Sequence, residues 1–118
     1  MDNNLSPSIQ GIGVDIVSVS RFVQYESDPK APFLKKVFFS DELMYCFSYK
    51  NPSVHLAGFF ALKEAASKAL GLEKYPFAEI EVKHAENGAP EVWFKGQKLG
   101  LRVSISHTDE FAVAIAAH

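Results

Sequence analysis

The most strongly helical stretch of the sequence is Phe60-Ala-Leu-Lys-Glu-Ala-Ala-Ser-Lys-Ala-Leu-Gly71. Alanine and leucine are strong helix formers, and a glycine commonly follows the last residue of a helix. Extended toward the N-terminus, the pattern predicts a helix from about Val54 to Leu70, with Ser53 as its N-cap and Gly71 as its stop.

Two charged residues of this helix, Glu64 and Lys68, lie four positions apart, so their side chains share one face. Exposed pairs of this kind are common and contribute only ~0.3–0.5 kcal/mol, which favours a solvated ion pair. A carboxylate and an ammonium beside small residues are also suited to holding a metal ion and a phosphate. The choice depends on the rest of the chain.

The segment before the helix begins with a predicted strand, Ile9–Val17, which is rich in β-branched residues. Its glycines indicate that other backbone or a ligand comes close. A short helix around residues 21–25 is expected to follow, with Ser18 or Ser20 as its N-cap. A second helix is predicted from Asp41 to Tyr49, with Ser40 as its N-cap.

The segment after the helix is rich in strand signals. Residues 79–83 alternate polar and apolar side chains, and the Asn87-Gly88 turn joins them to residues 91–95 in a predicted hairpin. Further strands are expected at residues 101–106 and 111–116. The order predicts an α+β fold in which an antiparallel sheet packs against the long helix, in one domain spanning 1–118 with residues 1–8 as a flexible tail.

The composition limits the function classes. The chain has 118 residues, of which 47% are hydrophobic, so it can form one hydrophobic core. A net charge of −2 argues against a general nucleic-acid binder. Cys46 is the only cysteine, which favours a buried reduced thiol. The start of the chain lacks the pattern of a signal peptide and no apolar run is long enough to span a bilayer, so we expect a cytoplasmic protein without a membrane partner.

Polar residues interrupt otherwise apolar elements at three places: Asp15 in the first strand, Glu64 with Lys68 on the helix, and Ser106-His107 at the end of a late strand. A charged residue inside an apolar strand is uncommon unless it is paired or binds something. If Asp15 and Glu64 come together, a divalent cation removes their repulsion. Mg²⁺ is the natural ion, because it binds through one or two carboxylates together with substrate phosphates.

These motifs, in this order, resemble the holo-acyl-carrier-protein synthase family of 4′-phosphopantetheinyl transferases. The family pattern of Gly-x-Asp with an arginine six residues later matches Gly13-Val-Asp15 and Arg21. Its helix motif matches residues 60–71, and its Asn-Gly-x-Pro turn matches residues 87–90. Its Ser-x-Ser-His strand end, followed by an aromatic and alternating alanines, matches residues 104–114. The resemblance covers the chain from about residue 11 to 116 and implies the short, single-domain type.

The resemblance implies transfer of the phosphopantetheine arm of coenzyme A to a serine of an apo acyl carrier protein, with release of adenosine 3′,5′-bisphosphate. It implies Mg²⁺ held by Asp15 and Glu64, and Lys68 on a phosphate or at the leaving group. The serine proton goes either to one of these carboxylates or to a water on the metal. The implied contacts to the coenzyme come from Lys63, Lys68, Ser106 and His107, although Lys63 can equally face solvent.

Other expectations concern the surroundings of the site. Arg21 takes the family's place for contacting the acidic carrier protein, although a plain surface arginine is the alternative. His107 is alternatively a residue that caps a hairpin, and the remaining histidines (His55, His84 and His118) are assigned to surface or packing. The family further implies a homotrimer with coenzyme A between subunits, acting in fatty-acid or related biosynthesis.

The sequence departs from the family pattern at two places. Phe59 stands where an arginine is common, and the loop after Gly71 lacks a second glycine. These departures support an alternative function, a non-catalytic relative that binds coenzyme A or a carrier protein. The third reading is a structural subunit in which the polar residues are coincidental.

Overall fold

The computed structural model describes residues 9–118, and the tail expected at residues 1–8 lies outside them. Its elements follow one another in the order listed here: β1 (Ile12–Ser18), α1 (Ser20–Val23), α2 (Pro32–Val37), α3 (Ser40–Phe47), α4 (Pro52–Ala69), β2 (Ile80–His84), β3 (Pro90–Phe94), β4 (Gln97–Lys98), β5 (Arg102–His107) and β6 (Phe111–Ala117).

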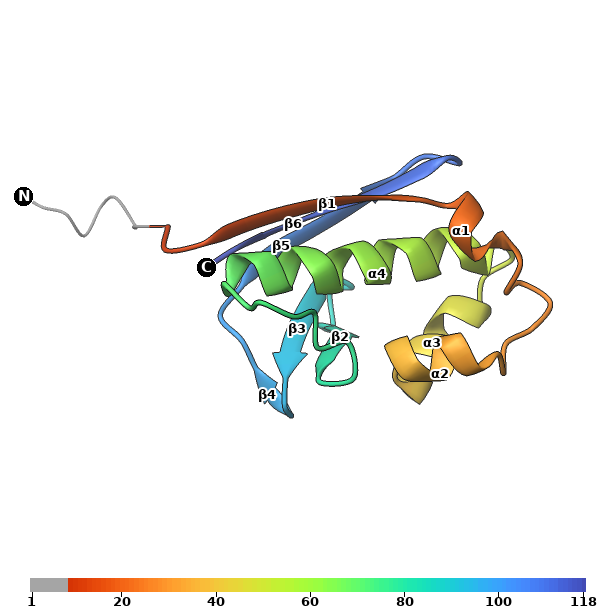
Figure 1. The fold of residues 1–118 in the computed structure, drawn as a ribbon, viewed down its shortest axis with the longest axis horizontal. Coiled ribbons are helices and arrows are strands. Elements are labelled where there is room, and N and C mark those ends of the chain that lie inside the picture. Colours follow the sequence, from red (N-terminus) through yellow and green to blue (C-terminus); the bar gives the residue numbers. More distant parts are fainter. Residues whose placement is uncertain (1–8) are drawn as a thin grey trace, which may run out of the picture.

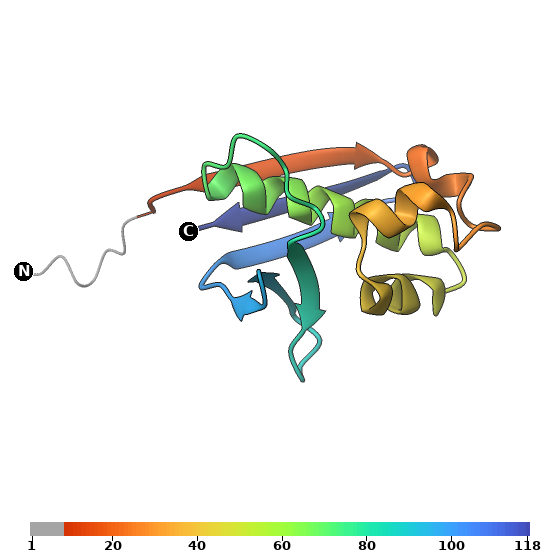
Figure 2. The ribbon, with the colours of Figure 1, turned by 60° about the horizontal axis from the view of Figure 1, so that its bottom comes forward.

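The strands of the described residues form two antiparallel sheets rather than the single sheet that the sequence suggested. Sheet A has the order β1-β6-β5, and sheet B has the order β2-β3-β4. Helix α4 lies along sheet A, and Figure 1 shows α1, α2 and α3 gathered near one end of this helix. Figure 2 shows the β2–β3 hairpin projecting beyond β5. The predicted fold class, an α+β fold with an antiparallel sheet against a long helix, is confirmed.

Two glycines allow β1 to approach α4 closely. A Cβ atom at Gly13 would overlap the carbonyl oxygen of Ala65, and a Cβ atom at Gly11 would overlap that of Ala69. The sequence predicted that other backbone or a ligand comes close to these glycines. In the structure it is the backbone of α4 that does so. Because of this close approach, Asp15, two residues after Gly13 on β1, lies within reach of the α4 side chain of Lys68.

The C-terminus of α4 is the one that the sequence predicted. Gly71 has a φ of 70°, a left-handed conformation that glycine adopts without steric cost. The Gly71 N–H donates to the carbonyl of Lys68, and the Leu72 N–H donates to that of Ser67. This pair of bonds is the Schellman motif, which satisfies carbonyls at the helix end.

The N-terminal caps differ from the prediction. The N-cap residues are Val19 for α1, Phe39 for α3 and Asn51 for α4, and none of the three makes a side-chain capping bond. The Ser53 hydroxyl instead donates to Glu26 Oε2 at 2.6 Å. The proposed caps at residues 18 or 20, 40 and 53 are therefore wrong, because each serine lies inside its helix or outside the cap position.

The core contains a fully buried ion pair. Lys63 Nζ lies 2.6 Å from Glu42 Oε1, and neither side chain is exposed. Lys63 also donates to the carbonyl of Val37 at 2.8 Å. Glu42 accepts hydrogen bonds from the backbone N–H groups of Phe39 and Val82, each at 2.7 Å. The pair thus joins α3, α4 and β2.

This position corrects the expectation for Lys63. We expected its ammonium group to reach either a phosphate or solvent, and it does neither. Helix geometry turns Lys63 about 100° away from Glu64, and that rotation directs it into the core.

The face of sheet A that points away from α4 is apolar and exposed. Its largest side chains come from β1 and β6: Ile12, Val14, Ile16, Phe111, Val113 and Ile115. We call these six residues the apolar sheet face. Within residues 9–118, none of the helices combines the length and hydrophobicity needed to cross a bilayer.

Candidate active site

Asp15, Glu64 and Lys68 come together where β1 passes α4. Lys68 Nζ lies 3.2 Å from Asp15 Oδ1 and 3.0 Å from the carbonyl oxygen of Val14. Asp15 is 14% exposed and Lys68 is 40% exposed, so the pair lies at the rim of the helix–sheet contact. The Glu64 side chain is half-buried beside Asp15.

The two carboxyl groups are close enough to perturb each other. Burial, together with the negative charge of Asp15 and a hydrogen bond between the two carboxyl groups, raises the pKa of Glu64 to about 7. The positive charges of Arg21 and Lys68 oppose this shift. The hydrogen bond to Asp15 raises the pKa of Lys68, so its ammonium group stays protonated at neutral pH.

The arrangement fits a small divalent cation. Asp15 Oδ2 is buried, and it accepts no hydrogen bond among residues 9–118 while Glu64 is ionised. A buried carboxylate oxygen without a partner is costly, and a cation between Asp15 and Glu64 would remove both this cost and the charge repulsion. Among the described residues no cluster of three or more acidic, histidine or cysteine side chains is placed to hold a metal. Two carboxylates match Mg²⁺, which takes its other ligands from water and phosphate.

Arg21 lies at the edge of the same site. Its guanidinium carbon is 4.9 Å from the ring centroid of Phe60, and its charge lowers the pKa of Glu64. Arg21 also lines a shallow cavity with aromatic side chains of α1 and its neighbours. The side chain is exposed, so it is available to a partner molecule.

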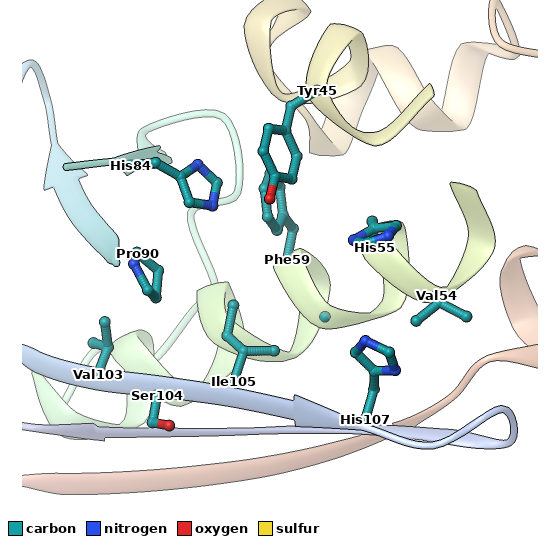
Figure 3. A pocket seen from close by; sticks show the side chains of 11 residues that line it. Tyr45, Val54, His55, Phe59, His84, Pro90, Val103, Ser104, Ile105 and His107 are labelled. Carbon is teal, nitrogen blue, oxygen red and sulfur yellow. The ribbon is translucent and has the colours of Figure 1, made fainter. Parts of the chain in front are cut away.

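His107 lies in a different place from the carboxylates. It lines a cavity of about 250 Å³ between α3, α4, the β2–β3 hairpin and β5, and neither Asp15, Glu64 nor Lys68 is among the lining residues. Figure 3 shows its ring directed into this space together with polar rings from other elements. We call this space the histidine cavity, and its side chains come from the following residues: Tyr45, Val54, His55, Phe59, His84, Pro90, Val103, Ser104, Ile105 and His107.

Ser106 faces the opposite side of sheet A. Ser106 pairs with Val113 across the sheet. Asp15 pairs with Ala114, which pairs with Ile105 on its other side, so Asp15 lines up with Ile105 and not with Ser106. Because side chains alternate between the two faces of a sheet, Ser106 projects toward the apolar sheet face and Asp15 toward α4. One chain therefore brings together Asp15, Glu64 and Lys68, but not Ser106 or His107.

Two further histidines line the histidine cavity. His55 and His84 were assigned to surface or packing, yet both line the cavity beside His107. The spacing of His55 and Phe59 on one helix carried a weak signal, because residues four apart share a face. No local pattern linked His84 to them, since it comes from a distant hairpin.

Comparisons with known proteins agree with this architecture. Residues 11–116 match the 4′-phosphopantetheinyl transferase superfamily. A holo-[acyl-carrier-protein] synthase of Thermodesulfovibrio yellowstonii is 44% identical over 107 residues, which cover 90% of this chain and 95% of the relative. One of Chlorobaculum parvum is 46% identical over 111 residues, covering 89% and 94%.

Solved structures give the same result. The Bacillus anthracis synthase in complex with CoA (3′,5′-ADP) aligns with a TM-score of 0.76 at 32% identity, covering 92% of this chain and 95% of that one. The Helicobacter pylori synthase in complex with coenzyme A aligns with a TM-score of 0.75 at 34% identity, covering 91% and 99%.

The chain belongs to the 4′-phosphopantetheinyl transferase superfamily. The activity expected from the sequence motifs, that of a holo-[acyl-carrier-protein] synthase, is confirmed. Such an enzyme transfers 4′-phosphopantetheine from coenzyme A to a serine of apo acyl carrier protein, so coenzyme A is the co-substrate.

Proposed function

We propose that this transferase works with Mg²⁺, held by Asp15 and Glu64. The observation that carries the proposal is the half-buried pair of carboxyl groups, in which Asp15 Oδ2 has no hydrogen-bond donor among the described residues while Glu64 is ionised. When bound, the ion would neutralise negative charge that develops on the pyrophosphate of coenzyme A.

Lys68 is proposed to contact a phosphate of the coenzyme. An ammonium group has three N–H donors, and Lys68 uses two of them on Asp15 and Val14. The third donor remains for a phosphate oxygen. Because the hydrogen bond to Asp15 keeps Lys68 protonated, its ammonium group can also stabilise the negative charge on the leaving phosphate oxygen. Phosphoryl transfer depends on this kind of positioning and charge stabilisation more than on covalent help.

The apolar sheet face supports a homo-oligomer, and we propose the homotrimer that the family resemblance implies. Three of its residues on β1 are between 57% and 65% exposed, namely Ile12, Val14 and Ile16. An exposed apolar patch of this kind marks an interaction surface. A neighbouring subunit would also bring a second Ser106 and His107 toward the carboxylates, which are separated from them within one chain. We therefore propose that coenzyme A binds between subunits.

The remaining proposals concern the biological setting. Arg21 lies exposed beside the carboxylates, where an acidic carrier protein delivering its serine would approach, and we assign it to that contact. Fatty-acid biosynthesis as the pathway and the cytoplasm as the location stay predictions from the sequence and its resemblance.

Coenzyme A binding followed by thermal unfolding tests the metal site. Coenzyme A with Mg²⁺ is expected to raise the unfolding temperature, and EDTA is expected to remove most of the rise. The alternative that the sequence left open, a non-catalytic coenzyme-binding relative, rested in part on Phe59 in the place of an arginine; its ring stacks on that of Tyr45 with centroids 5.3 Å apart. Such a relative would show the thermal shift without any transfer to a carrier protein.

A further inference from the structure

The buried ion pair between Lys63 and Glu42 takes no direct part in the proposed reaction, yet Lys63 directly precedes Glu64 on α4. We infer that these two are positioning residues of the transfer reaction: the pair fixes the rotation of α4 about its axis and so directs Glu64 toward Asp15. The inference rests on the proposed function in one respect, because it takes Glu64 as a ligand of Mg²⁺.

Lys63 is held by three segments of the chain at once. Its ammonium group donates to Glu42 Oε1 at 2.6 Å, and to the carbonyl oxygens of Val37 at 2.8 Å and Phe77 at 3.3 Å. These bonds use all three of its N–H donors, and their acceptors belong to α3, to the end of α2 and to the loop before β2. The side chain is fully buried, so a rotation of α4 would break these bonds where water does not replace them.

Glu42 is fixed as firmly as its partner. Its carboxylate accepts hydrogen bonds from the backbone N–H groups of Phe39 and Val82, each at 2.7 Å. Among residues 9–118, β2 is an edge strand of sheet B, and Glu42 binds the N–H of Val82 on its open side. The carboxylate therefore cannot follow a displaced Lys63 without losing its bonds to α3 and β2.

The opposite side of α4 does little to fix the same rotation. Figure 1 shows sheet A along one side of α4, with α3 and β2 toward the other. Toward sheet A, the helix presents Ala65 to Gly13 and Ala69 to Gly11. Such small residues bring two backbones close, but they form shallow ridges, and apolar contact has no preferred direction. The directional, fully buried contacts of α4 are those of Lys63.

The residues of the metal site do not hold α4 in this rotation by themselves. Glu64 and Asp15 repel each other when both are ionised. Lys68 joins α4 to Asp15, but its side chain is 40% exposed, and exposed ion pairs contribute little because solvent screens them.

A buried ion pair is suited to this positioning role. Such a pair is often no more stabilising than apolar side chains of similar volume, and its best-attested use is to specify one arrangement of the elements it joins. The pair of Lys63 with Glu42 acts one residue away from Glu64, so it specifies the arrangement in which that carboxylate faces β1.

The double variant Lys63→Met/Glu42→Gln separates positioning from stability, because it removes both buried charges together. Its turnover is expected to fall about tenfold or more, the usual loss when the support of a metal ligand is removed. The Mg²⁺ concentration that gives half of the coenzyme-induced rise in unfolding temperature is expected to increase by about tenfold. This second quantity measures binding without turnover, so it does not depend on the chemical step.

Val92→Ala is the matched control for lost stability. Val92 is buried on β3 and pairs with Val82, so the variant weakens sheet B while it leaves every bond of the ion pair in place. It is expected to unfold at a lower temperature, with the Mg²⁺ requirement and the turnover of the wild type.

Glu42→Asp keeps the test valid if the double variant does not fold. It retains the charge of the pair, but its side chain is one methylene shorter and cannot reach both Lys63 and the N–H of Val82 at the present distances. Its Mg²⁺ requirement is expected to increase in the same direction.

The outcomes distinguish the inference from the proposed function. A folded double variant with the Mg²⁺ requirement and the turnover of the wild type would overturn the inference alone, and so would a Mg²⁺ requirement that Val92→Ala raises equally. Where the double variant does not fold, a wild-type Mg²⁺ requirement in Glu42→Asp would overturn it. Full activity of Glu64→Gln would overturn the proposed metal site, and the inference with it.

Discussion

Lys68 of α4 donates a hydrogen bond to Asp15 of β1 across 3.2 Å, joining the two elements at the candidate active site. The contact leaves Asp15 Oδ2 buried beside the half-buried carboxyl group of Glu64, and it has no donor among residues 9–118 while Glu64 is ionised. One carboxylate oxygen is therefore paired with a cation and the other is not. This asymmetry is the structural basis of the proposed metal site.

Glu64→Gln is expected to lower the rate of transfer by roughly 100-fold or more, because the proposed ion supplies several kcal/mol of charge stabilisation. Asp15→Asn is expected to act in the same way. The fold should be retained, since each change removes the repulsion between two carboxylates. Initial rates of phosphopantetheine transfer and thermal unfolding of the same samples check this. Full activity, or unfolding of Glu64→Gln, would contradict the metal assignment.

The stabilisation by Mg²⁺ is expected to increase with pH. The folded-state pKa of Glu64 is about 7, above its ordinary value of 4.5, so the folded chain binds this proton more tightly than the unfolded chain. Without metal, Glu64 therefore contributes less stability as pH rises from about 4.5 to 7. Mg²⁺ competes with the proton, so its effect on the unfolding temperature should be larger at about pH 8 than at about pH 5.5. An equal effect at both pH values, or the same profile in Glu64→Gln, would count against the assignment.

Lys68→Ala is expected to lower turnover more than it lowers the affinity for Mg²⁺, because its proposed role is to contact a phosphate rather than the ion. Steady-state kinetics over a range of Mg²⁺ concentrations separate the two effects. Lys74→Ala is the matched control, since this exposed lysine lies just beyond the end of α4. Equal losses of turnover and Mg²⁺ affinity would exclude the phosphate role.

Lys63→Met is expected to destabilise the fold by about 3–5 kcal/mol, because it leaves Glu42 charged and buried without its partner. Urea unfolding measures the free energy directly. The double variant Lys63→Met/Glu42→Gln should recover much of the loss. If the single variant is as stable as the wild type, the buried pair does not hold α3, α4 and β2 together.

Local sequence patterns predicted the elements of the fold but not all of their ends. The helix at residues 54–70 and the hairpin around Asn87-Gly88 were found because their periodicity and turn residues are local signals. The predicted serine caps were wrong because tertiary contacts determine where these side chains bind. Ser53, for example, donates a hydrogen bond to Glu26, which is 27 residues away. The division of the strands into two sheets also depends on long-range packing.

The candidate site was predicted only in part, because some of its residues give a local signal and others depend on long-range contacts. Asp15 and Glu64 are polar interruptions in apolar elements, which a sequence reveals. The direction of Lys63 depends on Glu42, a partner 21 residues earlier that no local pattern identified. The histidine cavity joins His55, His84 and His107 from three separate elements, so it is visible only in the folded chain.

Intact-mass spectrometry of an apo acyl carrier protein, incubated with this protein, coenzyme A and Mg²⁺, tests the central claim most directly. The account predicts a mass increase of one phosphopantetheine, which disappears with EDTA and with Glu64→Gln. A mass increase that persists in both conditions would contradict the role of the metal pair. No increase across several carrier proteins, despite measurable binding of coenzyme A, would contradict the transferase activity itself.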